Sequence, residues 1–276
     1  MGGDMPGWRY EVTATDIDHF RVFGYVHVRH ALSDDFFTAL AKEIRTTLAQ
    51  AFVLDQSNEE ALGRAGFYLP MMGERTPVSR ELCVDPGLLD VAERLLGAFP
   101  LLKPAKGILY EDASGWHADT FDRHLSAVKV AVYLDPLNET NGALRVIPGS
   151  HMEPFSSELT TWRQRTRGPA LPLDEAAEAR DWPAICLATE PGDALLFDPH
   201  LWHASVLGRR RYQWTVSYAA ASEVEEKTRS NRGYIMSFLS DGHEYDRDTF
   251  PYIDAPWLEK HTSRMHRELR NAGVMP

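Results

Sequence analysis

The sequence has few of the features that mark a secreted or membrane-spanning protein. Cysteine occurs only twice, at Cys83 and Cys186, each alone in an apolar setting, so neither a disulfide framework nor a Cys-x-x-Cys metal site is indicated. No run approaches the roughly 20 apolar residues that a membrane helix needs. The N-terminus lacks the basic and apolar regions of a secretory signal. These absences favour a reducing, cytoplasmic location.

Basic residues are also scarce relative to acidic ones. The 29 Lys and Arg residues are outnumbered by 40 Asp and Glu, which gives a formal net charge of -11. Binding to nucleic acid or to an anionic membrane needs a basic surface, and the chain as a whole lacks one. We therefore expect a small-molecule partner, no nucleic acid and no membrane, and the sequence leaves the oligomeric state open.

The composition that remains is that of a folded enzyme or binding domain. Hydrophobic residues make up 43% of the 276 residues and charged residues 25%, without a low-complexity tract. A chain of this length can bury a full core. We expect a single domain over 1–276, with a mainly helical flank over 1–100, a β core over 101–222 and a C-terminal extension over 223–276.

Apolar spacing predicts helices in the first hundred residues. A helical period is found over 13–23, 33–48 and 85–96, and strict alternation over 25–28 predicts a strand. Residues 55–80 are rich in Gly, Pro and Met, which indicates a loop with short helical turns.

Short β-like runs follow from residue 101 onward, separated by turn sequences such as Asn141-Gly142 and Pro191-Gly192-Asp193. Strands are predicted over 107–110, 127–134, 143–147, 185–189, 194–197 and 214–218. Residues 150–183 interrupt them as an insertion with a cluster of arginines, which either covers one mouth of the barrel as a lid or is a solvated loop. The tail over 264–271 is predicted to be helical.

Six residues carry the clearest chemical signal: Gly115-Trp116-His117-Ala118-Asp119-Thr120. Residues two apart in a strand point to the same face, so His117 and Asp119 can converge on one ion. Two His and one carboxylate bind Fe(II) on one face and leave the other positions open. The best candidate for the second His is His203, and His200 is its competitor.

These residues belong to an ordered set of motifs by which the chain resembles the phytanoyl-CoA dioxygenase-like (PhyH) family of Fe(II)- and 2-oxoglutarate-dependent oxygenases. The resemblance rests on His117-Ala118-Asp119, on the run from Asn141 to His151, on Gly192-Asp193-Ala194-Leu195-Leu196-Phe197 leading to Trp202-His203-Ala204-Ser205, and on a following Arg. It covers most of the chain. It implies a mostly β fold with flanking helices, built on a double-stranded β-helix, which is a jelly-roll core of the cupin-like kind.

The resemblance also implies the roles of individual residues. His117, Asp119 and His203 would bind the iron, as metal ligands and catalytic residues. An Arg at the start of the next strand would bind the far carboxylate of 2-oxoglutarate through its planar fork. Arg209, Arg210 and Arg211 are the choices, and alternation places Arg209 and Arg211 on one face. We favour Arg211.

Further contacts to 2-oxoglutarate are expected from a basic or hydroxyl group on the strand before the iron motif. Lys103, Lys106 and Tyr110 are available there, of which Lys106 and Tyr110 are retained as candidates. Thr120 is a further candidate for the cosubstrate, or it caps a turn.

The reaction implied is a hydroxylation, or a related oxidation, of an unactivated carbon. Fe(II) is the cofactor, 2-oxoglutarate and O2 are cosubstrates, and succinate and CO2 are released. Related halogenases have Gly or Ala where Asp119 stands, so halogenation is not expected. The substrate is a small-molecule metabolite of natural-product or lipid-like acid metabolism.

Aromatic residues around these motifs suggest an apolar substrate pocket, and core packing explains the same residues. They are Tyr68, Trp116, Phe121 and Trp202. Two rival functions remain open. One is a cupin-like metal enzyme that does not use 2-oxoglutarate, and the other is a non-catalytic β-barrel that binds a small molecule.

Overall fold

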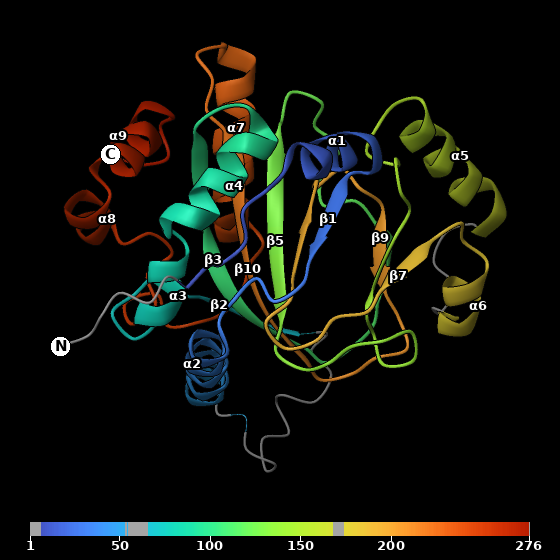
Figure 1. Ribbon diagram of the computed structural model, residues 1–276, viewed down its shortest axis with the longest axis horizontal. Coiled ribbons are helices and arrows are strands. Elements are labelled where there is room, and N and C mark those ends of the chain that lie inside the picture. Colours follow the sequence, from blue (N-terminus) through green and yellow to red (C-terminus); the bar gives the residue numbers. More distant parts are fainter. Residues whose placement is uncertain (1–6, 53, 55–65, 168–173, 276) are drawn as a thin grey trace.

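Two antiparallel sheets lie face to face at the centre of the molecule (Figure 1). The computed structural model describes residues 7–52, 54, 66–167 and 174–275, and the observations below concern those residues. The larger sheet has the strand order β1-β8-β5-β10-β3-β2. Its strands are β1 (Tyr25–Val28), β2 (Gly66–Pro70), β3 (Pro100–Tyr110), β5 (Ala127–Tyr133), β8 (Ala194–Phe197) and β10 (Arg211–Ala220).

The smaller sheet has the order β4-β9-β6-β7 and carries the iron motif. Its strands are β4 (Ser114–His117), β6 (Leu144–Val146), β7 (Ile185–Leu187) and β9 (His203–Ser205). Strands distant in sequence are paired here, because β4 and β9 are neighbours with His117 opposite His203. This pairing joins the two halves of the predicted metal site.

The central strand β10 separates an apolar layer from a polar one. Trp214, Val216 and Tyr218 point to one side and belong to the main hydrophobic core. Arg211, Gln213, Thr215 and Ser217 alternate with them and line two polar cavities next to the larger sheet. The main apolar core therefore lies between the larger sheet and the helices. A smaller apolar cluster, with members such as Leu144, Val146 and Phe197, joins the two sheets beside the polar cavity.

Helices from the N-terminal and C-terminal parts of the sequence flank the sheets. The N-terminal helices are α1 (Ala14–Phe23), α2 (Asp34–Phe52), α3 (Pro77–Leu82) and α4 (Pro86–Leu96), and the C-terminal helices are α7 (Glu225–Ser240), α8 (Ala255–His261) and α9 (Ser263–Asn271). Thr13 caps α1 at its start. Gly24 ends α1 in the left-handed conformation with φ 83°, which glycine adopts without strain. Within the described residues, no helix is both long and apolar enough to cross a membrane.

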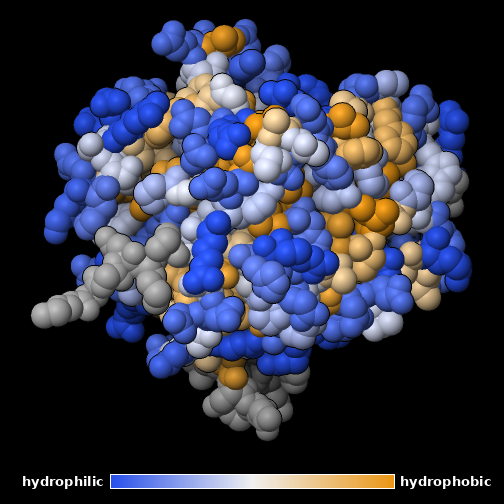
Figure 2. Space-filling model, viewed as in Figure 1, coloured by the Kyte–Doolittle hydropathy of each residue, from blue (hydrophilic) through white to orange (hydrophobic). Residues whose placement is uncertain are grey.

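The insertion over 150–183 contains two helices, α5 (Phe155–Arg167) and α6 (Glu175–Arg180). Leu159 and Trp182 from this segment pack with Trp116 and Trp202 in a separate hydrophobic cluster. The described part of the insertion lines neither of the two central cavities. The face seen in Figure 2 is largely hydrophilic, with hydrophobic side chains gathered where α1 and α5 lie.

The predicted elements agree with the structure except at three places. The loop predicted over 55–80 contains strand β2 and helix α3 in its described part, and residues 55–65 lie outside the described residues. The strand predicted over 107–110 begins seven residues earlier, at Pro100. The insertion carries helices where a loop was one of the two expectations.

Candidate metal centre and active site

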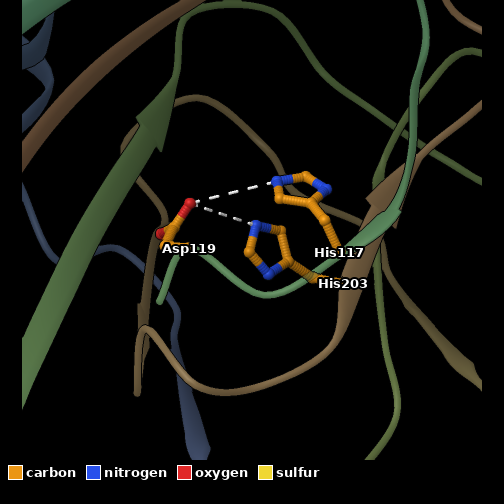
Figure 3. Close-up of side chains that lie close together, drawn as sticks. All are labelled: His117, Asp119 and His203. Atoms are coloured by element: carbon orange, nitrogen blue, oxygen red, sulfur yellow. Dashed lines mark ion pairs between the residues drawn. The ribbon is translucent and has the colours of Figure 1, made fainter. Parts of the chain in front are cut away.

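The structure brings together the three predicted ligands (Figure 3). His117 ends β4, His203 begins β9, and the two imidazole ring centres are 4.3 Å apart. Asp119 follows two residues after β4, where its backbone N–H donates to the carbonyl oxygen of Pro199. Asp119 Oδ1 lies 3.9 Å from His117 Nε2 and 3.8 Å from His203 Nε2. One ligand atom from each residue lies within 4.8 Å of the other two, so all three could bind a single metal ion.

Backbone hydrogen bonds orient both imidazoles toward that point. His117 Nδ1 lies 2.7 Å from the carbonyl oxygen of Gly115, and His203 Nδ1 lies 2.8 Å from that of Leu201. Because a carbonyl oxygen only accepts, each Nδ1 carries the proton and donates it. The lone pair on each Nε2 is then directed to the cluster, which is the arrangement of metal-binding histidines.

The charge state of the cluster suits a divalent cation. Burial alone raises the pKa of Asp119, but Lys129 and the two imidazoles hold that pKa well below its usual range. Lys129 Nζ donates to Oδ2 at 2.8 Å and leaves Oδ1 facing the histidines. Burial, with His117 close by, lowers the pKa of His203 to about 3. Two neutral nitrogen donors and one carboxylate are the donor set that non-haem Fe(II) takes.

His200, the alternative third ligand, is engaged elsewhere. Its Nδ1 lies 2.6 Å from Asp198 Oδ1 and its Nε2 lies 2.9 Å from the carbonyl oxygen of Asp122. Both ring nitrogens therefore have partners away from the cluster. The structure places His203, and not His200, beside His117 and Asp119.

A cavity of about 330 Å³ extends from the cluster to Arg211. We call it the first cavity. It is lined by Tyr68, Lys106, Ile108, Tyr110, Ser114, His117, Asp119, Lys129, Tyr133, Leu144, Phe197, His203, Ser205, Arg211, Gln213, Thr215, Asp241 and His243.

Arg211 is held in this cavity with part of its guanidinium unsatisfied. Nη2 donates to the carbonyl oxygen of Asp112 at 2.9 Å, and Nη1 donates to the hydroxyl of Ser205. Nε is buried and has no hydrogen-bond partner within the described part of the chain. Gly142 makes room for the side chain, because a Cβ there would lie 2.6 Å from Arg211 Cδ. A buried guanidinium with an open N–H fits a carboxylate ligand.

The two neighbouring arginines are engaged at the surface. Arg209 pairs with Glu175 and with Asp112, and Arg210 pairs with Glu111 at 2.9 Å. Arg210 has φ 52°, and β10 begins only at Arg211. The alternation predicted for Arg209 and Arg211 therefore does not apply, since Arg209 lies outside the strand.

The other candidates for cosubstrate contacts lie around the cluster. Lys106 lines the first cavity, and burial lowers its pKa to about 8. Tyr110 donates its hydroxyl hydrogen to Gln213 Oε1 at 3.3 Å and packs 5.1 Å from the Arg211 guanidinium. The Thr120 hydroxyl accepts from the backbone N–H of Asp122 at 3.1 Å, which caps a turn.

The predicted aromatic pocket residues are scattered. Tyr68 lines the first cavity. Trp116 and Trp202 are buried in the hydrophobic cluster beside the insertion, with Trp182 stacked against each of them. Phe121 is 55% exposed. Packing explains the two tryptophans, as the alternative interpretation of the sequence had it.

Sequence reasoning missed a second cavity, of about 520 Å³, on the other side of Asp119. Its walls come from β3, β5, β10, the iron loop and helix α7. It is lined by Lys103, Lys106, Asp119, Thr120, Asp122, Leu125, Lys129, Ser217, Arg229, Ser230, Gly233, Tyr234, Ser237 and Asp241. The available signal was the spacing of Arg229, Gly233, Tyr234 and Ser237, which share one face of a helix.

Comparison with known proteins decides the family. The model of the phytanoyl-CoA dioxygenase (PhyH) family matches residues 20–207 of this chain. The chain belongs to this family. An ectoine dioxygenase of Bordetella bronchiseptica (strain ATCC BAA-588 / NCTC 13252 / RB50) is 24% identical over an alignment of 218 positions, which covers 70% of each chain.

Solved structures of other proteins share the fold of this chain. The crystal structure of EctD from S. alaskensis with 2-oxoglutarate and 5-hydroxyectoine has a TM-score of 0.55 at 22% identity, and covers 80% of this chain and 79% of that one. The structure of EctD with bound Fe has a TM-score of 0.56 at 23% identity, and covers 78% and 82%. The predictions of the family and of the cupin-type jelly-roll core are confirmed.

Membership of the PhyH family also confirms the prediction of an iron- and 2-oxoglutarate-dependent dioxygenase. The residues of this chain fit both groups. The His-Asp-His cluster has the donors for iron, and Arg211, whose guanidinium is not fully hydrogen-bonded within the described residues, lines the cavity that reaches that cluster.

Proposed function

We propose that the protein hydroxylates a small polar metabolite, with Fe(II) held by His117, Asp119 and His203 and 2-oxoglutarate held in the first cavity by Arg211. The observation that carries the proposal is Arg211, a buried guanidinium with an unpartnered N–H among the described residues, which lines a cavity that reaches the metal cluster. A dicarboxylate can place one end on Arg211 while its other end reaches the metal. Lys106 and Tyr110 flank its path.

The protein residues act by positioning and by charge. When bound, Fe(II) and 2-oxoglutarate supply dioxygen activation, with conversion of 2-oxoglutarate to succinate and CO2. Lys129 fixes one oxygen of Asp119 and keeps the other available to the metal. Asp119 occupies the position that a halogenase leaves open, which supports oxygenation and not halogenation.

The polar walls of the second cavity support a polar metabolite over a lipid-like acid. Hydroxyl and charged side chains supply most of its lining, and Leu125 is its one aliphatic member. Desaturation or another oxidation of the same substrate is compatible with this site. A cytoplasmic location and the absence of nucleic-acid and membrane partners stay predictions.

Arg211→Met tests the proposal. Loss of a buried charge partner costs about 2 kcal/mol or more, so the Kd for 2-oxoglutarate should rise by at least roughly thirtyfold. Binding is measured by anaerobic titration of the Fe(II)-loaded protein. The matched control is Arg210→Met, which removes an exposed arginine and should leave the Kd unchanged. Equal affinity in wild type and Arg211→Met would show that residues other than Arg211 hold 2-oxoglutarate.

A further inference from the structure

An irregularity in β3 brings two lysines to the same side of the strand. Lys106 pairs with Thr215 of β10, and Lys103 pairs with Ser217. The chain therefore advances three residues along β3 where it advances two along β10, which is a β-bulge. In a regular strand, residues three apart point to opposite faces. Pro104 lies within the irregular segment and has no N–H for the ladder. The bulge therefore turns Lys103 into the second cavity together with Lys106.

Lys103 is buried without a negatively charged partner. The residue is 8% exposed, and its Nζ donates to the Ser237 hydroxyl at 2.9 Å. The same Nζ lies 3.8 Å from the centre of the Tyr234 ring, an arrangement that stabilises a cation. Among the described residues, Lys103 forms no ion pair, although the charges of Asp119 and Asp241 act on it from a greater distance. Burial, reinforced by Lys106, lowers the pKa of Lys103 to about 7.

Acidic residues that line the second cavity have other roles. Asp119 is paired with Lys129 and faces the metal cluster. Asp122 accepts the backbone N–H of His124 at 3.0 Å, and Asp241 lies 3.9 Å from His243 Nε2. A buried ammonium with only neutral partners is costly to the fold, and such a group is expected where a ligand supplies the counter-charge.

We propose that Lys103 binds a carboxylate of the substrate in the second cavity, so that the oxidised metabolite is a small carboxylic acid. Ser237 and Tyr234 hold the ammonium in place. Asp119 lines both cavities, so an acid bound in the second cavity would lie next to the metal cluster. The inference rests on the proposed function, because it assigns the second cavity to the substrate and the first to 2-oxoglutarate.

The test uses benzoate and its neutral analogue benzamide as probes. The full chain is loaded anaerobically with Fe(II) and saturating 2-oxoglutarate, and NMR broadening of the probe's ring protons by Fe(II) reports binding close to the metal. Benzoate should bind about tenfold or more tightly than benzamide. Lys103→Met should abolish this preference, whereas Lys227→Met, which removes an exposed lysine of α7, should retain it.

A second variant keeps the test independent of the loss of a buried side chain. Ser237→Asp places a carboxylate beside Lys103 and should also abolish the preference for benzoate. Equal binding of the two probes by the wild type, no binding of benzoate, or a preference retained in Lys103→Met would overturn the assignment. Loss of 2-oxoglutarate binding in Lys103→Met would overturn it too, by moving Lys103 to the cosubstrate. Failure of the wild type to bind 2-oxoglutarate would instead contradict the proposed function.

Discussion

Each ligand side chain of the metal cluster uses one polar atom toward the centre and a second toward the protein. The imidazoles of His117 and His203 donate from Nδ1 to backbone carbonyl oxygens, and Asp119 accepts from Lys129. Such contacts fix the orientation of ligands before a metal binds. At the scale of single residues, the hydrogen bonds made by the non-ligating atoms of these side chains are therefore as important to the site as the ligand atoms.

Lys129→Met should weaken iron binding without removing a ligand. The variant frees Oδ2 of Asp119 to rotate and removes the cation that lowers the carboxyl pKa. Loss of such a contact lowers metal affinity by about 10- to 100-fold. Anaerobic Fe(II) titration measures the change, and Lys260→Met, at an exposed position, is the control. An unchanged affinity would show that Asp119 is oriented by other contacts.

Lys103→Met should stabilise the fold, with a gain that depends on pH. The pKa of Lys103 is about 7 in the folded protein, against 10.5 for the ordinary side chain. Below pH 7 both folded and unfolded chains carry the proton, and the folded chain bears the full cost of the buried charge. Between these two pKa values the folded chain loses its proton first, so the cost declines as pH rises.

Thermal melting of Lys103→Met and wild type at pH 6 and pH 9 measures this difference. The melting temperature of the variant should exceed that of the wild type by a larger margin at pH 6. Charged side chains that a binding site needs often make the folded protein less stable. A variant that melts below the wild type at pH 6 would show that the ammonium stabilises the fold through Ser237 and Tyr234.

At the scale of elements, the motif Gly192-Asp193 has a structural explanation. The fully buried carboxylate of Asp193 accepts from the Arg29 side chain at 2.6 Å and from the backbone N–H groups of His30 and Glu190 at 3.0 and 2.9 Å. These contacts join the end of β1 to the turn before β8. The motif therefore stabilises an edge of the larger sheet, and neither of its residues lines the cavities at the metal cluster.

Asp193→Asn should destabilise the protein and leave iron binding intact. Burial raises the pKa of Asp193, but the N–H donors of Glu190 and His30, with Arg29, lower it overall. Hydrogen bonds to charged groups are worth about 1.5–3 kcal/mol each, and Arg29 is half-exposed, so a loss of roughly 2 kcal/mol is expected. The stabilisation is present above the ordinary carboxyl pKa and lost as pH falls through the lowered value.

Urea unfolding at pH 7 measures the free energy of unfolding of Asp193→Asn. Asp90→Asn is the control, because Asp90 is exposed and its one ion pair in the described part of the chain is with Arg94, within α4. A free energy of unfolding equal to that of the wild type would mean that the Asn amide replaces the carboxylate in the network.

The elements that the sequence predicted poorly share a physical cause. Strand β3 is buried on both faces over most of its length, so its sequence does not alternate between apolar and polar residues. Pro104 also interrupts the run of strand-forming residues. Helix α5 is highly polar, and its apolar stripe consists only of Phe155, Leu159 and Trp162, so its sequence resembles that of a polar loop. By contrast, α2 and α4 have wide apolar faces, and their positions were predicted closely.

At the scale of the whole molecule, basic side chains gather around the metal cluster of an acidic protein. The net charge of -11 contrasts with three lysines and Arg211 around the metal cluster. The sequence predicted the family, the core type and the cluster, because those depend on ordered motifs. It did not predict the second cavity, because that cavity depends on a bulge in β3 and on how α7 packs across β3 and β10.

The aromatic residues near the motifs suggested an apolar pocket, whereas packing against the insertion accounts for Trp116 and Trp202.

The central claim is that His117, Asp119 and His203 hold an iron ion to which 2-oxoglutarate binds. The most direct measurement is anaerobic titration of the metal-free protein with Fe(II) and then 2-oxoglutarate, following the weak visible charge-transfer band of the chelated 2-oxo acid. The band should appear in the wild type and in His200→Ala, and should be absent in His203→Ala. Iron binding without the band in the wild type, or a band retained in His203→Ala, would contradict the claim.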